Sequence, residues 1–324
     1  MFRIDDVTAA TSLPTPEAAG TEGYFTEGNP AAGTPATNVR GSWLNMVQEE
    51  LRAVVVAGGL TPSKTTYNQV LTAIRSMFSP VVGTARNLSM AIATASSTAT
   101  LTADEIIVES ALGGQTYKLA GFNKTINLAT TGPGGIDYAG TVPASGFVGI
   151  YAIYNPTTGA SALVAQGANV LLPNIYNNGS AIPSLGYTAS ALVSVVPTNA
   201  SSQFSPVFQN DRNVAFGGSN ILTSSAVVNA SPTIVNALVI PMNAKTVGGF
   251  IQAGSTAASA VGIAVYPTSV ALGGKIMAAN VGAGQSQAVP FERLGISTPQ
   301  RLFYTSSNGA GTPAFTISLN NYDF

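Results

Sequence analysis

The sequence of 324 residues contains no cysteine and no histidine, and only 8% of its residues are charged. Without cysteine the chain has no disulfide framework and no thiolate metal site. Without histidine it lacks the most frequent general base and metal ligand, together with every Ser–His or Cys–His nucleophile pair. These absences exclude several large classes of enzyme and metalloprotein.

Charge of either sign is equally scarce. The formal net charge is −1, so nothing directs the whole molecule toward nucleic acid or an anionic membrane. No apolar run is long enough to cross a bilayer, and residues 1–6 lack the basic-then-apolar layout of a signal peptide. We therefore expect no nucleic-acid partner, no membrane insertion and assembly in a cytoplasm.

The residues that are abundant are small and favour β-structure. Hydrophobic residues make up 45% of the chain, and many of them are Ala and Val. They are interspersed with Ser, Thr, Asn and 34 Gly. Disordered chains instead have high net charge and few β-branched residues. The length allows two or three domains, each with a sizeable core.

The uneven distribution of charge predicts a boundary near Pro80, because 12 of the 27 charged side chains lie in residues 1–80. We predict an attachment module over 1–80, a β-rich domain over 81–217 and a distal β-domain over 218–324. Gly217-Gly218-Ser219-Asn220 either separates the last two or forms a loop inside one large domain.

Residues 1–80 predict an extended arm followed by two short helices. Pro14, Pro16, Pro30 and Pro35 prevent a long helix in the arm. Helical spacing of apolar residues begins after Ser42, a possible cap, and ends at Gly58-Gly59. A second helix is expected from about Thr66 to Met77. This module is too small for an independent core, so we expect it to complete itself against a partner or symmetry mates.

From about residue 85 short apolar runs alternate with turns, which favours antiparallel sandwiches or barrels. Ile153 to Gly159 is the sharpest hairpin signal, and alternation from Phe315 to Leu319 predicts that the chain ends in a strand. The candidate strands are 98–102, 105–112, 125–129, 147–154, 160–166, 188–196, 234–241, 247–252, 261–266 and 314–320.

Two blocks resemble known proteins. The first, at about 22–78, contains Gly-Tyr-Phe-Thr-Glu-Gly-Asn-Pro at 23–30 and Trp-Leu-Asn-Met-Val-Gln-Glu-Glu-Leu at 43–51. It resembles the N-terminal part of tail fibre and receptor-binding proteins of tailed bacteriophages of Gram-negative bacteria. The second, at about 145–216, is similar to β-structured modules of fibre and spike proteins and includes Ile-Tyr-Asn-Pro-Thr-Thr-Gly at 153–159. Residues 220–324 share with these proteins only a low content of charge and an expected strand at the end.

The resemblance implies an elongated, homotrimeric protein of the virion tail. It would be attached to other tail or baseplate proteins through residues 1–80 and would bind a host surface glycan or protein distally. It implies no cofactor. The alternatives are a structural adaptor or a capsid or baseplate fibre that never touches the receptor, and a spike that depolymerises glycans.

Candidate attachment residues lie on the arm and the first helix. Trp43 either fills a pocket on a partner protein or packs under the second helix. Tyr24-Phe25 either docks on a partner or forms a hydrophobic staple over the helix pair, and we favour docking. The predicted attachment residues are Tyr24, Phe25, Trp43, Leu44, Val47 and Leu51.

Catalysis has few candidate groups in the β-region. A glycosidase needs two carboxylates about 5–10 Å apart. Asp104, Glu105 and Glu109 indicate either the solvated face of one strand or a charge cluster at the edge of a trimer. Asp211-Arg212 and Glu292-Arg293 indicate ion pairs at a surface or an interface. We expect no enzyme activity and no metal site.

Clusters of Tyr and Asn are the candidate receptor contacts, because rings stack on sugars and amides bond hydroxyl groups. Each cluster can also be an ordinary β-turn, and for any single cluster the turn is the favoured interpretation. The clusters are Tyr176-Asn177-Asn178, Tyr304 with Ser306-Ser307-Asn308, and Asn320-Asn321-Tyr322. The receptor-binding candidates are Tyr304, Asn308, Asn321 and Tyr322.

Overall fold

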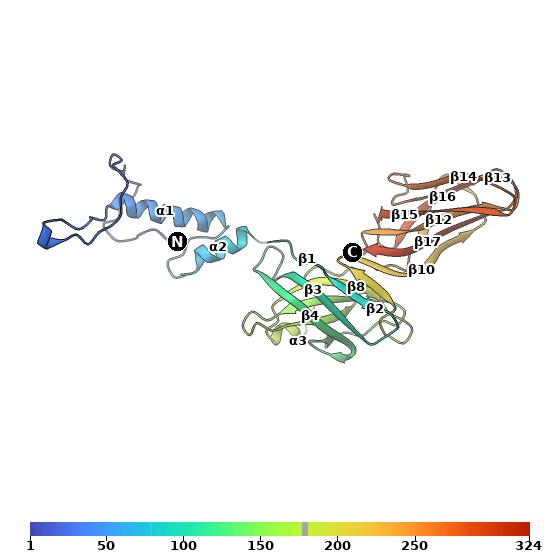
Figure 1. The fold of residues 1–324 in the computed structure, drawn as a ribbon, viewed down its shortest axis with the longest axis horizontal. Helices are drawn as coiled ribbons and strands as arrows, with labels where there is room; N and C mark the ends of the chain where they lie inside the picture. The colour runs from blue at the N-terminus through green and yellow to red at the C-terminus, as the bar shows by residue number, and fades with distance from the viewer. Residues whose placement is uncertain (79, 177–180) are drawn as a thin grey trace. The chain divides into compact units, whose positions relative to one another are not determined.

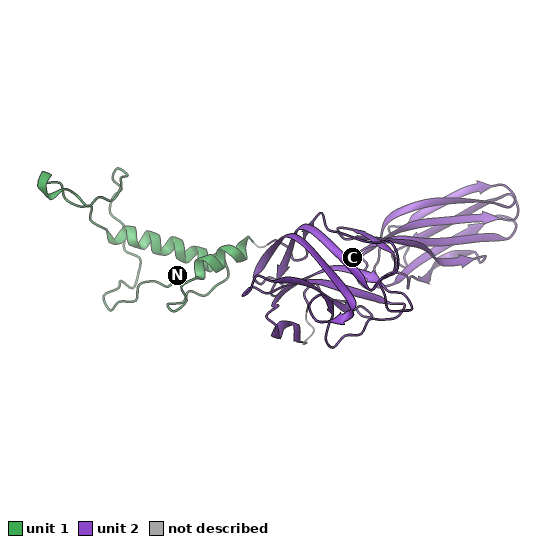
Figure 2. Ribbon diagram, turned by 60° about the horizontal axis from the view of Figure 1, so that its bottom comes forward, with its two compact units in different colours: residues 1–79 green, residues 80–324 purple. Residues whose placement is uncertain are grey.

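The computed structural model describes residues 1–78, 80–176 and 181–324. The chain forms two compact units, Met1–Ser79 and Pro80–Phe324 (Figure 2). Strands account for 46% of the chain and helices for 10%. This confirms the prediction of a mainly β protein with a short N-terminal helical region. No helix among the described residues has the length and apolar character needed to cross a membrane.

The first unit consists of the arm, a 3₁₀ turn η1 (Pro30–Ala32) and helices α1 (Gly41–Ala57) and α2 (Gln69–Met77). Helix α1 ends where expected, with the Gly58 N–H bonded to the Val54 carbonyl. Gly58 also lets the two helices approach, since a Cβ on it would lie 2.5 Å from the Cβ of Ala73. Helix α2 begins three residues later than Thr66.

The second unit begins with strands that close a barrel. In the strand order β3-β4-β5-β7-β6-β8, a further pairing of Glu109 with Ser190 joins β8 back to β3. The pairing is antiparallel as predicted, except that the short β5 runs parallel to β4 and β7. The elements are β1 (Ala85–Arg86), β2 (Ser89–Ile92), β3 (Thr98–Glu109), β4 (Thr116–Thr131), β5 (Gly135–Ile136), β6 (Phe147–Tyr154), β7 (Ser161–Gly167), α3 (Ala181–Ser184), β8 (Ala189–Pro197) and β9 (Val207–Asn210).

The remaining eight strands form two four-stranded layers. One layer has the order β15-β12-β17-β10 and the other β11-β16-β13-β14 (Figure 1). This alternation of early and late strands across both layers is the strand order of a jelly roll. The strands are β10 (Asn213–Ser224), β11 (Val228–Asn236), β12 (Thr246–Ser255), β13 (Ser259–Tyr266), β14 (Lys275–Val281), β15 (Gln285–Gly295), β16 (Arg301–Asn308) and β17 (Pro313–Asp323).

Gly217 and Gly218 lie inside β10 rather than in a linker. Strand β10 pairs with β9 from Asn213 to Phe216 and with β17 along its length, and its register shifts between Ala215 and Ser219. The glycines therefore occupy a β-bulge, a frequent position for glycine in strands. The predicted division between 217 and 218 falls within this strand, and residues 80–324 form one compact unit.

Local turn chemistry was a reliable guide to the hairpin that joins β6 and β7. The Asn155 side chain accepts hydrogen bonds from the backbone N–H groups of Thr157 and Thr158, at 3.0 and 3.1 Å. Gly159 has a positive φ of 74°. The predicted C-terminal strand is also present, with Phe315, Ile317 and Leu319 fully buried.

Candidate attachment site in the N-terminal unit

The N-terminal unit has almost no core of its own. Within residues 1–78, the buried hydrophobic side chains are those of Val55 and Ala73 at the crossing of α1 and α2. Gln69 is buried beside them, where its amide donates to the Thr61 carbonyl and accepts from the Ser63 N–H. The outer faces of both helices remain apolar and exposed, with Leu44, Leu71, Ile74 and Met77 among them.

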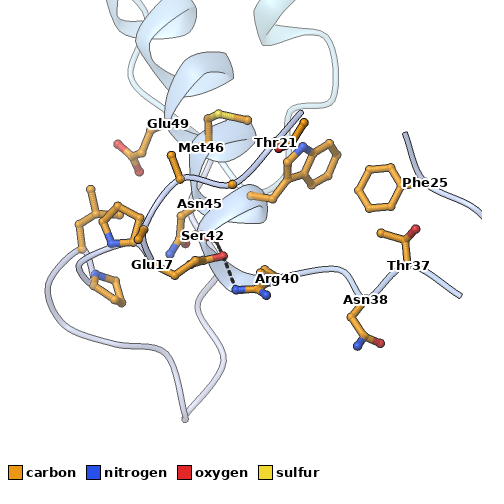
Figure 3. Close-up of a pocket in the computed structure, with 17 residues that line it drawn as sticks. Glu17, Thr21, Phe25, Thr37, Asn38, Arg40, Ser42, Asn45, Met46 and Glu49 are labelled. Atoms are coloured by element: carbon orange, nitrogen blue, oxygen red, sulfur yellow. Dashed lines mark hydrogen bonds and ion pairs between the residues drawn. The ribbon is translucent and has the colours of Figure 1, made fainter. Parts of the chain in front are cut away.

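An apolar pocket of about 690 Å³ lies between the arm and α1. The Phe25 ring meets the Trp43 indole edge to face, with centroids 5.1 Å apart. Figure 3 shows Phe25 on the arm and Met46 on the helix at this pocket. Trp43 therefore packs against the arm and not under the second helix, yet 42% of its surface stays exposed. Edge-to-face pairs of this kind stabilise by about 0.5–1.5 kcal/mol beyond their buried area.

Polar contacts hold the arm at the beginning of α1. The Glu17 carboxylate accepts a hydrogen bond from the Ser42 hydroxyl at 2.9 Å and forms an ion pair with Arg40 at 3.2 Å (dashed in Figure 3). The expectation that Ser42 caps the helix is wrong, because its hydroxyl is used for the arm and Arg40 occupies the capping position without a side-chain bond. A hydrogen bond from its own backbone N–H, followed by that of Ser42, lowers the pKa of Glu17.

The first five residues are fastened to the helices in the same way. The Arg3 guanidinium binds both oxygens of Glu49, at 2.5 and 2.7 Å, and the Ile4 N–H donates to the Gln48 side chain at 2.7 Å. Lys64 pairs with Asp5 at 2.7 Å. The Arg3 hydrogen bond lowers the pKa of Glu49. These segments enclose a second, mostly apolar pocket of about 720 Å³ that includes Leu44.

The predicted attachment residues are thus divided between different surfaces. Phe25 and Trp43 line the first pocket, and Leu44 lines the second. Tyr24 is 97% exposed and makes no ring contact with another described residue. Val47 and Leu51 are half-buried on α1. Sequence reasoning missed the parts played by Leu13, Met46 and residues 1–5, which lie far apart in the chain.

Two of the four predicted receptor contacts are wrong, because both tyrosines are buried. Tyr322 is fully buried, and its hydroxyl donates to the Val195 carbonyl at 2.6 Å. Tyr304 faces the core between the jelly-roll layers. Asn308 is half-buried and binds the turn carbonyls of Ala310 and Gly311.

The other Asn predictions have different outcomes. Asn321 is half-buried and its side chain donates to that of Asn320 at 2.9 Å. Asn177 and Asn178 lie outside the described residues, and their neighbour Tyr176 is buried.

The carboxylates of the β-region are dispersed. Asp104 accepts a hydrogen bond from Asn87, and Glu105 lies 4.0 Å from Lys118. Glu109 does not lie on a solvated face, because it is buried and accepts from the Gly113 N–H. The described residues contain no group of three or more Asp or Glu placed to hold a metal ion.

Asp211 and Arg212 do not form the ion pair that the sequence suggested. Asp211 instead accepts from the Leu88 N–H at 3.1 Å. The Arg212 guanidinium lies 4.9 Å from the centre of the Phe324 ring, and burial lowers its pKa. The four ion pairs found among the described residues leave out Glu292 and Arg293 as well.

Comparison with known proteins gives a partial match. No family model matches the chain. Over 77 residues the chain is 44% identical to a protein of Escherichia coli strain K12 named uncharacterized protein StfP. The match covers 24% of this chain and 35% of StfP, so the chain spans about a third of the length of that relative. The chain is therefore similar to StfP over a limited stretch.

Proposed function

We propose that this protein is a non-enzymatic fibre of a tailed bacteriophage, held in the virion by residues 1–80 and adsorbing to the host surface through its β-region. The proposal rests on one observation: among residues 1–78 the only buried hydrophobic side chains are those of Val55 and Ala73. A segment that exposes this much apolar surface needs a partner to cover it. At the first pocket Phe25 and Trp43 form an aromatic pair that is partly exposed. Exposed aromatic side chains of this kind often anchor protein interfaces.

Three further observations support the proposal. The residues at 23–30 and 43–51 resemble the attachment end of tail fibres, and the chain is similar over 77 residues to StfP of Escherichia coli. The β-region ends in a jelly roll, an architecture that also occurs in viral and lectin domains. Homotrimer formation belongs to the proposal, because the apolar faces of α1 and α2 are free to pack on other copies.

A cryo-EM map of the intact particle tests the proposal. We expect density for residues 1–80 against another virion protein, with Trp43 at the contact, and residues 220–324 facing outward. Exposed and unattached N-terminal residues would refute it. If residues 220–324 were covered by another virion protein, the chain would be a structural adaptor. Cleavage of host polysaccharide by the purified protein would refute the non-enzymatic part.

Substitution adds a quantitative test of attachment. Trp43→Ala removes the aromatic anchor, and loss of a hot spot costs at least about 2 kcal/mol, or roughly 30-fold in affinity. We expect Trp43→Ala protein to be missing from purified particles in a complementation assay. Val7→Ala is the control, because Val7 is in the same N-terminal unit, is 99% exposed and lines neither pocket. Equal incorporation of the two variants would contradict the proposed anchor.

A further inference from the structure

A shallow groove of about 430 Å³ lies on the outer face of the four-stranded jelly-roll sheet. Strands β11, β16, β13 and β14 all contribute to it. Its volume falls within the range of about 300–1,000 Å³ that is usual for small-molecule pockets. Tyr304, on the same strand β16, faces the opposite, buried side of this sheet.

The floor of the groove is made by small side chains in register. Along β13, Val261, Ile263 and Val265 are buried in the core, so Gly262 and Ala264 lie on the outer face, where Gly262 is partly exposed and Ala264 is itself covered. Gly262 is paired with Ser307 on one side and Ala278 on the other. Glycine leaves room for the Ser307 hydroxyl here, because a Cβ on Gly262 would lie 2.7 Å from it.

One wall is a bulge in β11. Val228 pairs with Ser306 and Thr233 with Tyr304, so residues 229–232 all stand opposite Thr305 alone. The buried Ser306 hydroxyl holds this bulge, because it accepts from the Val228 N–H at 3.0 Å and donates to the Ala226 carbonyl at 3.1 Å. Such bulges often adjoin functional sites.

The polar groups of the groove are uncharged. The Thr305 hydroxyl lies 3.3 Å from the Tyr266 hydroxyl at one end, and Ser307 adds a third hydroxyl group. Among the described residues that line the groove, none is Asp, Glu, Lys or Arg. Hydroxyl groups both donate and accept hydrogen bonds. The alanine and glycine floor of the groove can therefore contact the apolar face of a ring, and the hydroxyl groups of the groove can bond the polar edge of that ring. The described residues of the groove include no charged side chain to pair with an ion.

We infer that this groove binds one neutral sugar unit of a host surface glycan. The inference rests on the proposed adsorption function and names the ligand class and its contact surface. The apolar C–H face of a pyranose ring would lie on Gly262 and Ala278, with its hydroxyl groups directed to Thr305 and Ser307. A shallow site binds weakly, but several copies of a fibre can raise avidity by about 10²–10⁴ without new contacts.

Saturation-transfer NMR on the full chain tests the inference, with the methyl glycosides of glucose, galactose, mannose and N-acetylglucosamine as probes at millimolar concentration. We expect transfer to at least one of them. Ala278→Trp fills the groove and should abolish the transfer. Gln287→Trp is the matched control, because Gln287 is exposed on the edge strand β15 of the other layer, and it should leave the transfer unchanged.

Thr305→Val provides a second variant that keeps the side-chain shape and removes one hydroxyl group, and it should reduce the transfer at least several-fold. Absence of transfer to all four probes in the native chain, or full transfer in Ala278→Trp, would overturn the inference. Adsorption of the particle to its propagating strain is measured in parallel. Retained adsorption without glycoside binding would refute only the groove, whereas adsorption that never depends on this protein would refute the proposed function.

Discussion

Replacing Tyr322 by Phe should weaken the β-unit even though the ring is retained. The Tyr322 hydroxyl is fully buried and donates to the Val195 carbonyl at 2.6 Å, which ties β17 to β8 of the barrel. The substitution takes a donor from a buried carbonyl, which costs about 1–3 kcal/mol. For a unit of this size each kcal/mol lowers the melting temperature by about 2–4 °C.

Differential scanning calorimetry at fixed protein concentration measures the shift, since assembly makes stability depend on concentration. Tyr304→Phe is the matched control, because Tyr304 is also buried but its hydroxyl makes no hydrogen bond with another described residue. We expect the control to change stability by less than about 0.5 kcal/mol. Equal shifts for both variants, or no shift for Tyr322→Phe, would refute the assignment of Tyr322 as a buried link.

Three other predictions concern separate parts of the chain. Gly58→Val should overpack the α1–α2 crossing against Ala73 and destabilise it by about 1–3 kcal/mol, measured by the loss of helical circular dichroism on heating. Arg3 lowers the pKa of Glu49 from its ordinary value of 4.5, so the Arg3–Glu49 ion pair stabilises residues 1–5 fully above pH 4.5. This stabilisation is lost as the pH falls through the lowered pKa of Glu49. The hydrogen-exchange rate of residues 1–5, corrected for intrinsic rates, should rise as the pH falls below 4.5. The Arg3→Gln variant should not show this rise. Asn155→Ala deletes the two turn hydrogen bonds and should lower the melting temperature of the β-unit by about 2–12 °C, whereas an unchanged value would contradict the role of the turn.

Much of the secondary structure could be predicted from the sequence where local patterns are strong. Helix α1 was predicted from its helical spacing and the Gly58-Gly59 stop, and β6 from an apolar run that ends at Asn155-Pro156. No strand was predicted for β10, β14, β15 and β16 or for the short β1, β2, β5 and β9. Of the four longer ones, β14 and β15 lie at sheet edges. Edge strands bury one face at most, so their polar and small residues show no apolar run. Gly217-Gly218 was interpreted as a break because a bulge and a linker favour the same residue.

The candidate sites were less predictable than the elements that carry them. Trp43 and Phe25 were predicted as attachment residues, which stays a prediction, and their ring contact depends on how residues 13–40 return to α1. The sugar groove had no signal in the sequence, because its floor combines Gly262, Ala278 and Ser307 from three strands, and each residue alone is unremarkable in a β-protein.

The sequence by itself determined the mainly β fold class, the N-terminal helices and the principal turns. Composition indicates the fold class, and apolar spacing and turn residues act over a few neighbouring positions. Tertiary structure alone decided which side chains are available for binding. Tyr322 and Tyr304 have the chemistry of surface contacts, yet strand register turns both toward the core. A shift of one residue in register would reverse the face of every side chain, and register is set by pairing with strands that are distant in sequence.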